Sequence, residues 1–330
     1  MAFSMPLPSD VGTFQTPRYY LRAESGDELK LEYEVMRTVE RCDEIMSSPD
    51  FELPMLPSVA AELLQLLQEP DVQLYKVCRL VTTDPVVTAK VLKLANSAIF
   101  SPNMRITTIP EAITRLGLNQ LRDLVVCVGL HTTLFGDPRL KLLGFRIWTH
   151  AVECAVVSDA LARQCDGGPV AAFLPGLLHD IGQVPALLFV QRAAAKLAHV
   201  RQSFLLDLVE RVHLRTGLAL LTQWKLPNEV HLAITAHQAP CHDLRDLAPY
   251  ATLRFRDCDD ETRAKLLRCL GAVVLADRLL ALAGFSAEPA PVELLGSPLA
   301  LYFNVVDLDP QRFRESIRGH IEHAALLSNL

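Results

Sequence analysis

A histidine and an aspartate stand side by side in an otherwise apolar segment, Leu177–Gly182. An unpaired carboxylate buried among apolar side chains costs on the order of several kcal/mol. A fold that buries this segment must therefore give Asp180 hydrogen-bond partners or a metal ion. Imidazole nitrogen from His179 and carboxylate oxygen from Asp180 form a donor set that suits Zn, Mn, Fe or Mg. Such doublets are frequent by chance, so the metal interpretation depends on further residues.

Four further residues support a metal site, because each stands in a segment whose apolar residues recur at helical spacing. They are His150, His213, His237 and Asp277. Adjacent residues of one helical turn can both reach one ion, and other helices can complete its ligand shell. The alternative for each histidine is a hydrogen-bonded residue of the core. We expect that plainer role for four others, His131, His199, His231 and His242.

The composition favours an all-α fold. Half of the residues are apolar and only 6% are aromatic, and leucine, alanine and valine supply most of the apolar content, which is typical of packed helices. No segment alternates strictly between apolar and polar residues, so we expect little or no sheet. A chain of 330 residues can form two modest domains or one large one.

Charge and cysteine usage exclude several classes of protein. The net charge of −6 gives no reason to expect general binding to nucleic acids or to anionic membranes. The eight cysteines include no C-x-x-C pair, and the first ten residues lack the pattern of a secretory signal. The apolar stretch 271–285 is interrupted by Asp277 and Arg278 and is too short to cross a bilayer. We expect a cytoplasmic protein with reduced thiols.

Cap residues divide the first half of the chain into short helices. An amphipathic helix is expected over 27–48. Ser58, Asp71, Asp84 and Thr108 are the expected N-caps, and Gly117 is the expected break between the last two helices. The predicted helices cover 58–68, 72–82, 85–97, 109–116 and 118–134, a compact bundle of five. Asn96 is expected to cap a helix C-terminus in the left-handed conformation, with a contact between two bundles as the alternative.

The second half has the same helical character. The predicted helices cover 140–164, 169–180, 184–200, 203–224, 227–237, 263–283 and 309–327. The polar, proline-containing segment 238–260 is expected to be a long loop near the predicted metal ligands. A turn at 136–140 is expected to separate the two halves.

Several motifs in a fixed order resemble the bacterial HDOD (HD-related output) domain. They include Leu53–Pro57, Leu94–Ala98, Phe145–His150, Gly176–Gly182 and Trp224–Pro227, and the resemblance covers about residues 50–285. It implies an all-helical fold of two packed bundles, the second similar to those of the HD superfamily. The expected layout is a leader with an amphipathic helix over 1–50, an N-terminal bundle over 51–136, an HD-like bundle over 137–285 and a helical extension over 286–330.

The resemblance also implies a metal-ligand set. His150, His179, Asp180 and Asp277 match the HD superfamily pattern, and His213 and His237 stand where related cyclic-dinucleotide phosphodiesterases hold a second metal. Those relatives have a lysine where this chain has Gln183, and a second histidine and a Gly-Tyr-Pro motif where it has Gln238–Cys241. These departures remove a cation that would face phosphate.

The expected function is therefore a non-enzymatic signal-transduction module that acts through contact with a signalling protein, with an HD-like site that is degenerate or structural. The alternative is a metal-dependent phosphohydrolase acting on a nucleotide or cyclic dinucleotide, with His179 and Asp180 at the reaction centre.

Overall fold

The computed structural model describes residues 53–69, 71–96, 105–134, 141–165, 170–194, 202–224, 226–239, 243–254, 258–282 and 297–303, with 37, 39–42, 44, 168, 241 and 305. The chain divides into two compact units. The first combines residues 1–51 with 187–211, and the second combines 52–186 with 212–330. The predicted helix 309–327, most of 27–48 and the predicted boundary at 136–140 lie outside the described residues, and the predicted domain layout stays a prediction.

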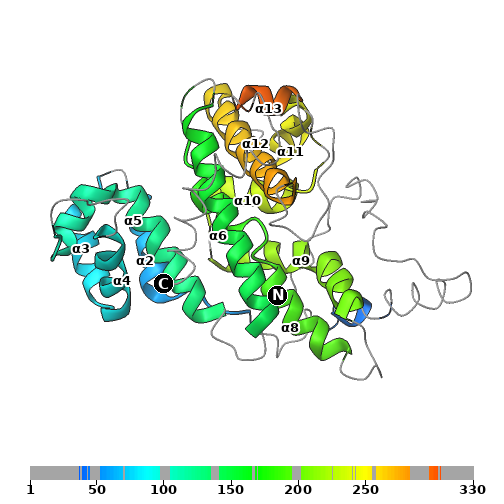
Figure 1. Ribbon diagram of the computed structural model, residues 1–330, viewed down its shortest axis with the longest axis horizontal. Helices are drawn as coiled ribbons and strands as arrows, with labels where there is room; N and C mark the ends of the chain where they lie inside the picture. The colour runs from blue at the N-terminus through cyan, green and yellow to red at the C-terminus, as the bar shows by residue number, and fades with distance from the viewer. Residues whose placement is uncertain are drawn as a thin grey trace, which may run out of the picture. The chain divides into compact units, whose positions relative to one another are not determined.

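The described residues form helices and no strands, which confirms the predicted all-α fold (Figure 1). Within the second unit the first helices are α2 (Ser58–Leu66), α3 (Leu74–Thr82), α4 (Pro85–Ala95) and α5 (Ile109–Leu134). Gly117 interrupts α5 with a φ of 78°, a backbone conformation that favours glycine, so α5 comprises two helical segments. The five predicted helical segments of this region are therefore present.

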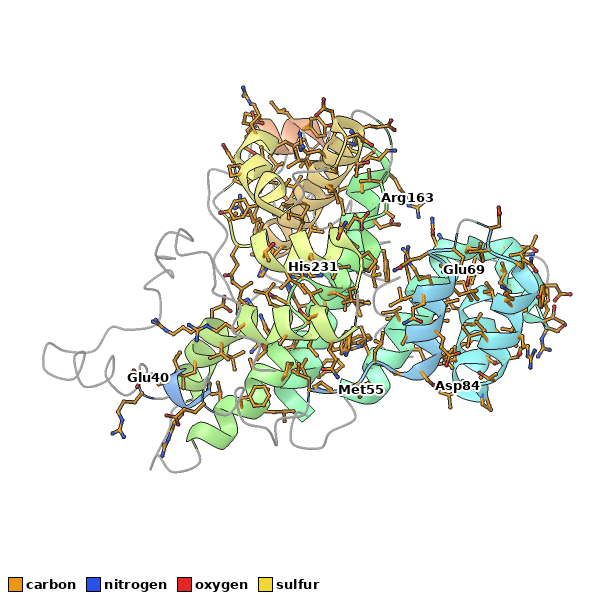
Figure 2. All side chains as sticks on the ribbon, turned by 180° about the vertical axis from the view of Figure 1, so that it is seen from behind. Glu40, Met55, Glu69, Asp84, Arg163 and His231 are labelled. Atoms are coloured by element: carbon orange, nitrogen blue, oxygen red, sulfur yellow. The ribbon has the colours of Figure 1, made fainter. Side chains whose placement is uncertain are left out.

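Two of the predicted caps are confirmed. Asp84 accepts hydrogen bonds from the backbone nitrogens of Val86 and Val87 (2.8 and 3.1 Å) at the start of α4, where Figure 2 labels it. At the start of α5 the Thr108 hydroxyl accepts from Glu111 N (3.4 Å), and the Glu111 carboxylate accepts from Thr108 N (3.2 Å). This reciprocal pair is a capping box.

Two other predicted caps are wrong. Pro57 rather than Ser58 is the N-cap of α2, because Ser58 already has a helical conformation. The N-cap of α3 is Gln73, so the helix begins beyond the reach of Asp71. Neither helix has a side-chain cap hydrogen bond, and packing of buried residues such as Leu63 and Val77 stabilises them instead.

Asn96 ends α4 as predicted, but not in the left-handed conformation, since its φ is −96°. Its side chain donates to Leu92 O (2.8 Å) and Ile106 O (2.7 Å) and accepts from Ile106 N (2.7 Å). Asn96 therefore joins the end of α4 to the segment that leads into α5, which is neither the expected left-handed cap nor a contact between bundles.

The later helices are α6 (Lys141–Arg163), α7 (Phe173–Leu178), α8 (Gln183–Ala194), α9 (Gln202–Trp224), α10 (Asn228–Ala236) and α12 (Asp260–Leu282), close to the predicted ranges. The segment 238–260 is not the expected loop. It contains the short helix η2 (Leu244–Leu247), which Asp243 and Asp246 cap reciprocally, and α11 (Ala248–Arg254). A further unpredicted helix is α13 (Pro298–Tyr302).

The core of the second unit gathers around α12. Apolar side chains of α6, α10 and α13 pack against its buried residues, among them Leu270, Leu275 and Leu279. Each fully buried leucine contributes roughly 2 kcal/mol of stability.

An apolar stretch, Phe173–Val190, has the length and mean hydropathy of a membrane span, but 83% of it is buried in the protein and the turn His179–Gly182 divides it. Burial in the core accounts for its composition.

Candidate metal centre

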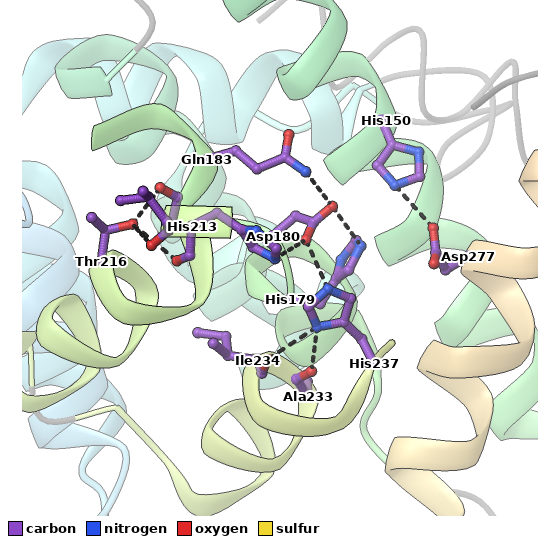
Figure 3. A network of polar contacts seen from close by, with 12 residues as sticks. His150, His179, Asp180, Gln183, His213, Thr216, Ala233, Ile234, His237 and Asp277 are labelled. Carbon is purple, nitrogen blue, oxygen red and sulfur yellow. Dashed lines mark hydrogen bonds and ion pairs between the residues drawn. The ribbon is translucent and has the colours of Figure 1, made fainter. Parts of the chain in front are cut away.

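Six side chains from five segments of the second unit meet in one cluster (Figure 3). The turn between α7 and α8 carries two of them, and the others stand on α6, on α9, directly after α10 and on α12. They are His179 and Asp180, then His150, His213, His237 and Asp277. Two subsets, His150 with His179 and Asp180, and Asp180 with His213 and His237, each have candidate ligand atoms within 4.8 Å of one another.

The His-Asp turn is fixed by its close approach to α9. A Cβ atom at Gly182 would lie 1.9 Å from His213 O and 2.6 Å from Gly217 N, so only glycine fits at this crossing. The Thr216 hydroxyl donates to Gly182 O over 2.6 Å. This contact holds the turn against the same stretch of α9 that carries His213.

Asp180 lies at the centre of the cluster. Its Oδ1 is 3.0 Å from His237 Nε2 and 3.7 Å from His213 Nε2, and its Oδ2 is 3.4 Å from His179 Nε2. Gln183 Nε2 donates to the same Oδ2 over 2.9 Å. Both oxygens of the carboxylate therefore face nitrogen atoms.

Asp277 and His150 form a second, more exposed part of the cluster. Asp277 Oδ1 lies 3.2 Å from His150 Nε2, and both side chains keep some contact with solvent. The ring centroids of His150 and His179 are 5.4 Å apart in an edge-to-face arrangement. This pair therefore borders the buried part of the cluster.

Backbone carbonyls set the tautomers of two imidazoles. His179 Nδ1 lies 2.7 Å from Gly176 O, and His237 Nδ1 lies 3.0 Å from Ile234 O. A carbonyl oxygen only accepts, so each Nδ1 carries a proton. The Nε2 of each ring is therefore the atom directed at Asp180. Metal-binding histidines are commonly oriented by such a hydrogen bond from the other ring nitrogen.

The carboxylates of the cluster are held ionised. Burial acts to raise the pKa of Asp180, but the charges of His179 and His237 hold it well below its usual range. Burial acts to lower the pKa of His150, but the hydrogen bond and charge of Asp277 raise it to about 9. Burial lowers the pKa of His179.

The residues present fit a divalent metal ion. Among the described residues, His179 Nε2 and Asp180 Oδ1 are buried and make no hydrogen bond of good geometry. Nε2 of His237 lies only 3.0 Å from a carboxylate oxygen, a distance at which either a proton or a cation must lie between the two atoms. Imidazole nitrogen with carboxylate oxygen suits Zn, Mn and Fe. The predicted convergence of His150, His179, Asp180 and Asp277 is confirmed as geometry, and metal binding itself stays a prediction.

Of the other histidines, two lie half-buried outside the cluster, and their expected role as hydrogen-bonded core residues stays a prediction. The ring of His131 packs against Trp148 with centroids 5.2 Å apart, and His231 is half-buried on α10. His199 and His242 lie outside the described residues.

The sequence interpretation noted Gln183 only as the replacement for a lysine and missed its contact with Asp180, and it did not single out Thr216 or Arg278. Gln183 stands three residues after Asp180, and Thr216 three residues after His213, so helical spacing could have placed both beside a ligand. Arg278 donates to the carbonyls of Ala239 and Cys241, and no local signal predicts contacts that span 37 and 39 residues.

A known protein is similar to this chain in sequence. An uncharacterised protein of Treponema pallidum (strain Nichols) is 30% identical in an alignment 231 residues long, which covers 64% of this chain and 44% of that protein. The chain thus spans less than half the length of this curated relative.

Three solved structures share the fold at under 25% identity. An HDOD domain protein of unknown function from Geobacter sulfurreducens has a TM-score of 0.58 and 23% identity, covering 89% of this chain and 98% of that one. A protein of Shewanella amazonensis SB2B, provisionally named a metal-dependent phosphohydrolase, has a TM-score of 0.59 and 19% identity, covering 91% and 99%. One of Marinobacter aquaeolei VT8, provisionally named a signal transduction protein, has a TM-score of 0.57 and 21% identity, covering 92% and 66%.

The HDOD domain family matches residues 53–240, more than half of the chain. The match ends before α12, so Asp277 lies outside it although the structure brings this residue to the cluster. With the helical fold and the motifs of the matched segment, this match shows that the chain belongs to the HDOD domain family, an HD-related family.

Proposed function

We propose that this protein is a non-enzymatic signal-transduction module in which the cluster around Asp180 holds a divalent metal ion as part of the folded structure. The observation that carries the proposal is the convergence of three imidazole nitrogens on the buried carboxylate of Asp180. His237 directs Nε2 at Asp180 Oδ1 over 3.0 Å, and a divalent ion would bind both atoms where a proton otherwise joins them.

Burial favours a structural role over a catalytic one. His179, His213 and His237 are almost completely buried, whereas a hydrolase must offer an open metal position to water and substrate. Gln183 follows the His-Asp turn, and its amide donates to Asp180 Oδ2. A neutral amide engaged in this way supplies no positive charge to a phosphate group.

Signalling through protein contact is supported by the HDOD family match and by Gln183, which stands where the related phosphodiesterases have a lysine. One similar solved protein carries the provisional name of a signal transduction protein. The partner in this proposal is another signalling protein, and the setting is the cytoplasm, as the free cysteines suggest.

A second candidate is a metal-dependent phosphohydrolase acting on a nucleotide or cyclic dinucleotide. It is favoured by the position of Asp180 between two candidate ligand triplets, with its two oxygens directed at different imidazoles. A shared carboxylate suits a pair of metal ions, which in hydrolases activate water and stabilise the charge of the transition state. In that case His150, His179, His213, His237 and Asp277 would complete the two ligand sets.

The experiment that separates the candidates combines metal content, stability and turnover. Protein purified without chelator is analysed for Zn, Mn, Fe and Mg, and is then screened against phosphodiesters and nucleotides with added Mn or Fe. We expect bound metal and no turnover. His179→Ala should lose the metal and about 1–3 kcal/mol of stability, because its partners become unsatisfied.

The control is His131→Ala, which removes a histidine outside the cluster and should keep the metal. Metal-dependent turnover that disappears in His179→Ala would overturn the structural role in favour of the hydrolase. Absence of metal from the wild type, together with no gain in thermal stability when metal is added, would contradict both candidates.

A further inference from the structure

A guanidinium group on α12 holds the backbone that follows His237. Arg278 Nη2 donates to Ala239 O over 2.6 Å, and Arg278 Nη1 donates to Cys241 O. Ala239 and Cys241 are both 1% exposed, so their carbonyl groups lose water on folding and need donors from the protein. One half-buried side chain supplies a donor to each of them.

The held segment continues directly from the last turn of α10. His237 N donates to Ala233 O, and Ala239 N donates to Ala236 O, both over 3.0 Å. The imidazole of His237 depends on this turn, because its Nδ1 lies 3.1 Å from Ala233 O and 3.0 Å from Ile234 O. The last turn of a helix frays unless its end is tied, and loss of this turn would release the ring.

Beyond Cys241 the chain is fixed as well. The Cys241 thiol donates to Asp243 O over 3.2 Å, and Asp243 caps η2. The segment is therefore anchored at η2 on one side and depends on Arg278 where it leaves α10.

The residue before Arg278 is Asp277, whose carboxylate pairs with His150 over 3.2 Å. Two consecutive residues of α12 thus act on two different histidines of the cluster. Asp277 contacts His150 directly, whereas Arg278 acts on His237 through hydrogen bonds to the backbone that follows it.

We infer that Arg278 is a positioning residue: by bonding the carbonyls of Ala239 and Cys241 it keeps the last turn of α10 intact and the Nε2 of His237 directed at Asp180. An arginine is needed because its planar fork presents two N–H groups at a fixed spacing, whereas the single ammonium of a lysine does not match that geometry. The effect on metal binding rests on the proposed metal site, but the effect on the orientation of the His237 ring does not.

The first test measures metal affinity in Arg278→Met, Arg278→Lys and a matched control, Arg263→Met. Arg263 also stands on α12 and donates to a backbone carbonyl, that of Cys258 (3.2 Å), but it lies near the far end of the helix from Asp277. Loss of a residue that orients a metal ligand typically weakens metal binding by about 10–100-fold. We expect that loss in Arg278→Met, little restoration by Arg278→Lys, and unchanged affinity in Arg263→Met.

Cobalt reports on the ligands themselves. The visible absorption of the Co²⁺-loaded protein should change in Arg278→Met, because His237 leaves or distorts the ligand shell, and it should stay unchanged in Arg263→Met. A general loss of stability without displacement of His237 would not produce this difference.

The second test needs no metal. Nitrogen-15 NMR of the histidine rings in chelated protein should show a protonated, hydrogen-bonded Nδ1 for His237 in the wild type and loss of that hydrogen-bonded signal in Arg278→Met, with the ring of His179 as the internal reference. If the wild type binds no metal, the proposed function fails while this test still decides the role of Arg278.

Arg278→Lys and Arg278→Gln retain a single donor nitrogen and provide folded variants should the methionine variant unfold. An unchanged His237 ring in every folded variant would overturn the inference. A changed ring in Arg278→Lys or Arg278→Gln would support it.

Discussion

Two aspartates of the second unit are buried to nearly the same extent, but their pKa values are shifted in opposite directions. Asp123 on α5 is 8% exposed and Asp180 is 9% exposed. Burial raises the pKa of Asp123 to about 6, even though Arg122 lies against it. The charges of neighbouring imidazoles hold the pKa of Asp180 well below its usual range.

The difference lies in how the two carboxylates are surrounded. Arg122 directs both Nε and Nη2 at one oxygen of Asp123, over 2.8 and 2.6 Å. Asp180 has nitrogen atoms around both oxygens, from three histidines and from Gln183. Burial alone therefore does not mark a functional carboxylate. The arrangement around Asp180 is organised to keep a negative charge in a buried place, which is what a cation site requires.

The largest expected effect is the loss of the response to metal in Asp180→Asn. A ligand that binds only the folded state adds about 4 kcal/mol of stability when its free concentration is 1,000 times its Kd. We expect Mn²⁺ to raise the Tm of the wild type and not that of Asp180→Asn, as measured by calorimetry with and without chelator. Asp123→Asn has the same substitution at equal burial and should keep the full response. Equal responses of the two variants would refute the distinction drawn between the two carboxylates.

The second largest expected effect is a change of stability with pH that the titration of Asp123 causes. Its pKa of about 6 in the folded state lies above the ordinary 3.8, so the folded protein binds the proton more tightly than the unfolded chain. Stability is then lost as pH rises from about 4 to above 6, by at most about 3 kcal/mol. Asp123→Asn should remove this loss and be more stable than the wild type at pH 8, with little difference at pH 4.

Urea unfolding of chelated protein across this pH range measures the effect. Arg122 keeps 18% of its side-chain surface exposed, so its guanidinium remains hydrated when the charge of Asp123 is removed. A difference between wild type and Asp123→Asn that does not vary with pH would contradict the assignment.

The sequence predicts local features of this molecule well. The cap at Asp84 and the capping box at Thr108 and Glu111 join residues two or three positions apart, so the spacing along the chain contains the interaction. The convergence of the histidines with Asp180 was also predictable, because a buried His-Asp doublet needs partners and the motifs around it resemble a known family.

Contacts that depend on packing could not be predicted in the same way. Arg278 meets carbonyls that are 37 and 39 residues away, and the position of α9 against Gly182 depends on how two helices cross. The error at Asp71 has a related cause. A good cap residue was present, but α3 begins at Leu74, nearer to its buried residues Val77 and Val81.

A smaller effect is expected for Gln183→Ala, which removes the donor to Asp180 Oδ2. A hydrogen bond to a charged group contributes about 1.5–3 kcal/mol, so stability should fall by an amount in that range at pH 7 in chelated protein. The pKa of Asp180 should also rise toward the behaviour of Asp123, which carbon-13 NMR of the carboxyl group measures. The control is Gln223→Ala, a change at an exposed glutamine of α9. An unchanged Asp180 titration would mean that the imidazoles alone determine its pKa.

The smallest effect concerns a third aspartate, whose partners are backbone N–H groups. Asp84 accepts from Val86 N and Val87 N, and removing such a cap typically costs about 1 kcal/mol. Asp84→Ala should therefore lower the free energy of unfolding by about that amount, with no change in the response to metal. Asp71→Ala is the matched control, because Asp71 stands before a helix whose N-cap is Gln73, and a surface change of this kind stays within about 0.5 kcal/mol. If Asp71→Ala were the more damaging of the two, α3 would begin earlier in solution than its N-cap at Gln73 indicates. In that case the hydrogen bonds that Asp84 accepts from backbone N–H groups would contribute little to stability. The contrast between Asp84 and the other two carboxylates, Asp123 and Asp180, would then be smaller than their different partners suggest.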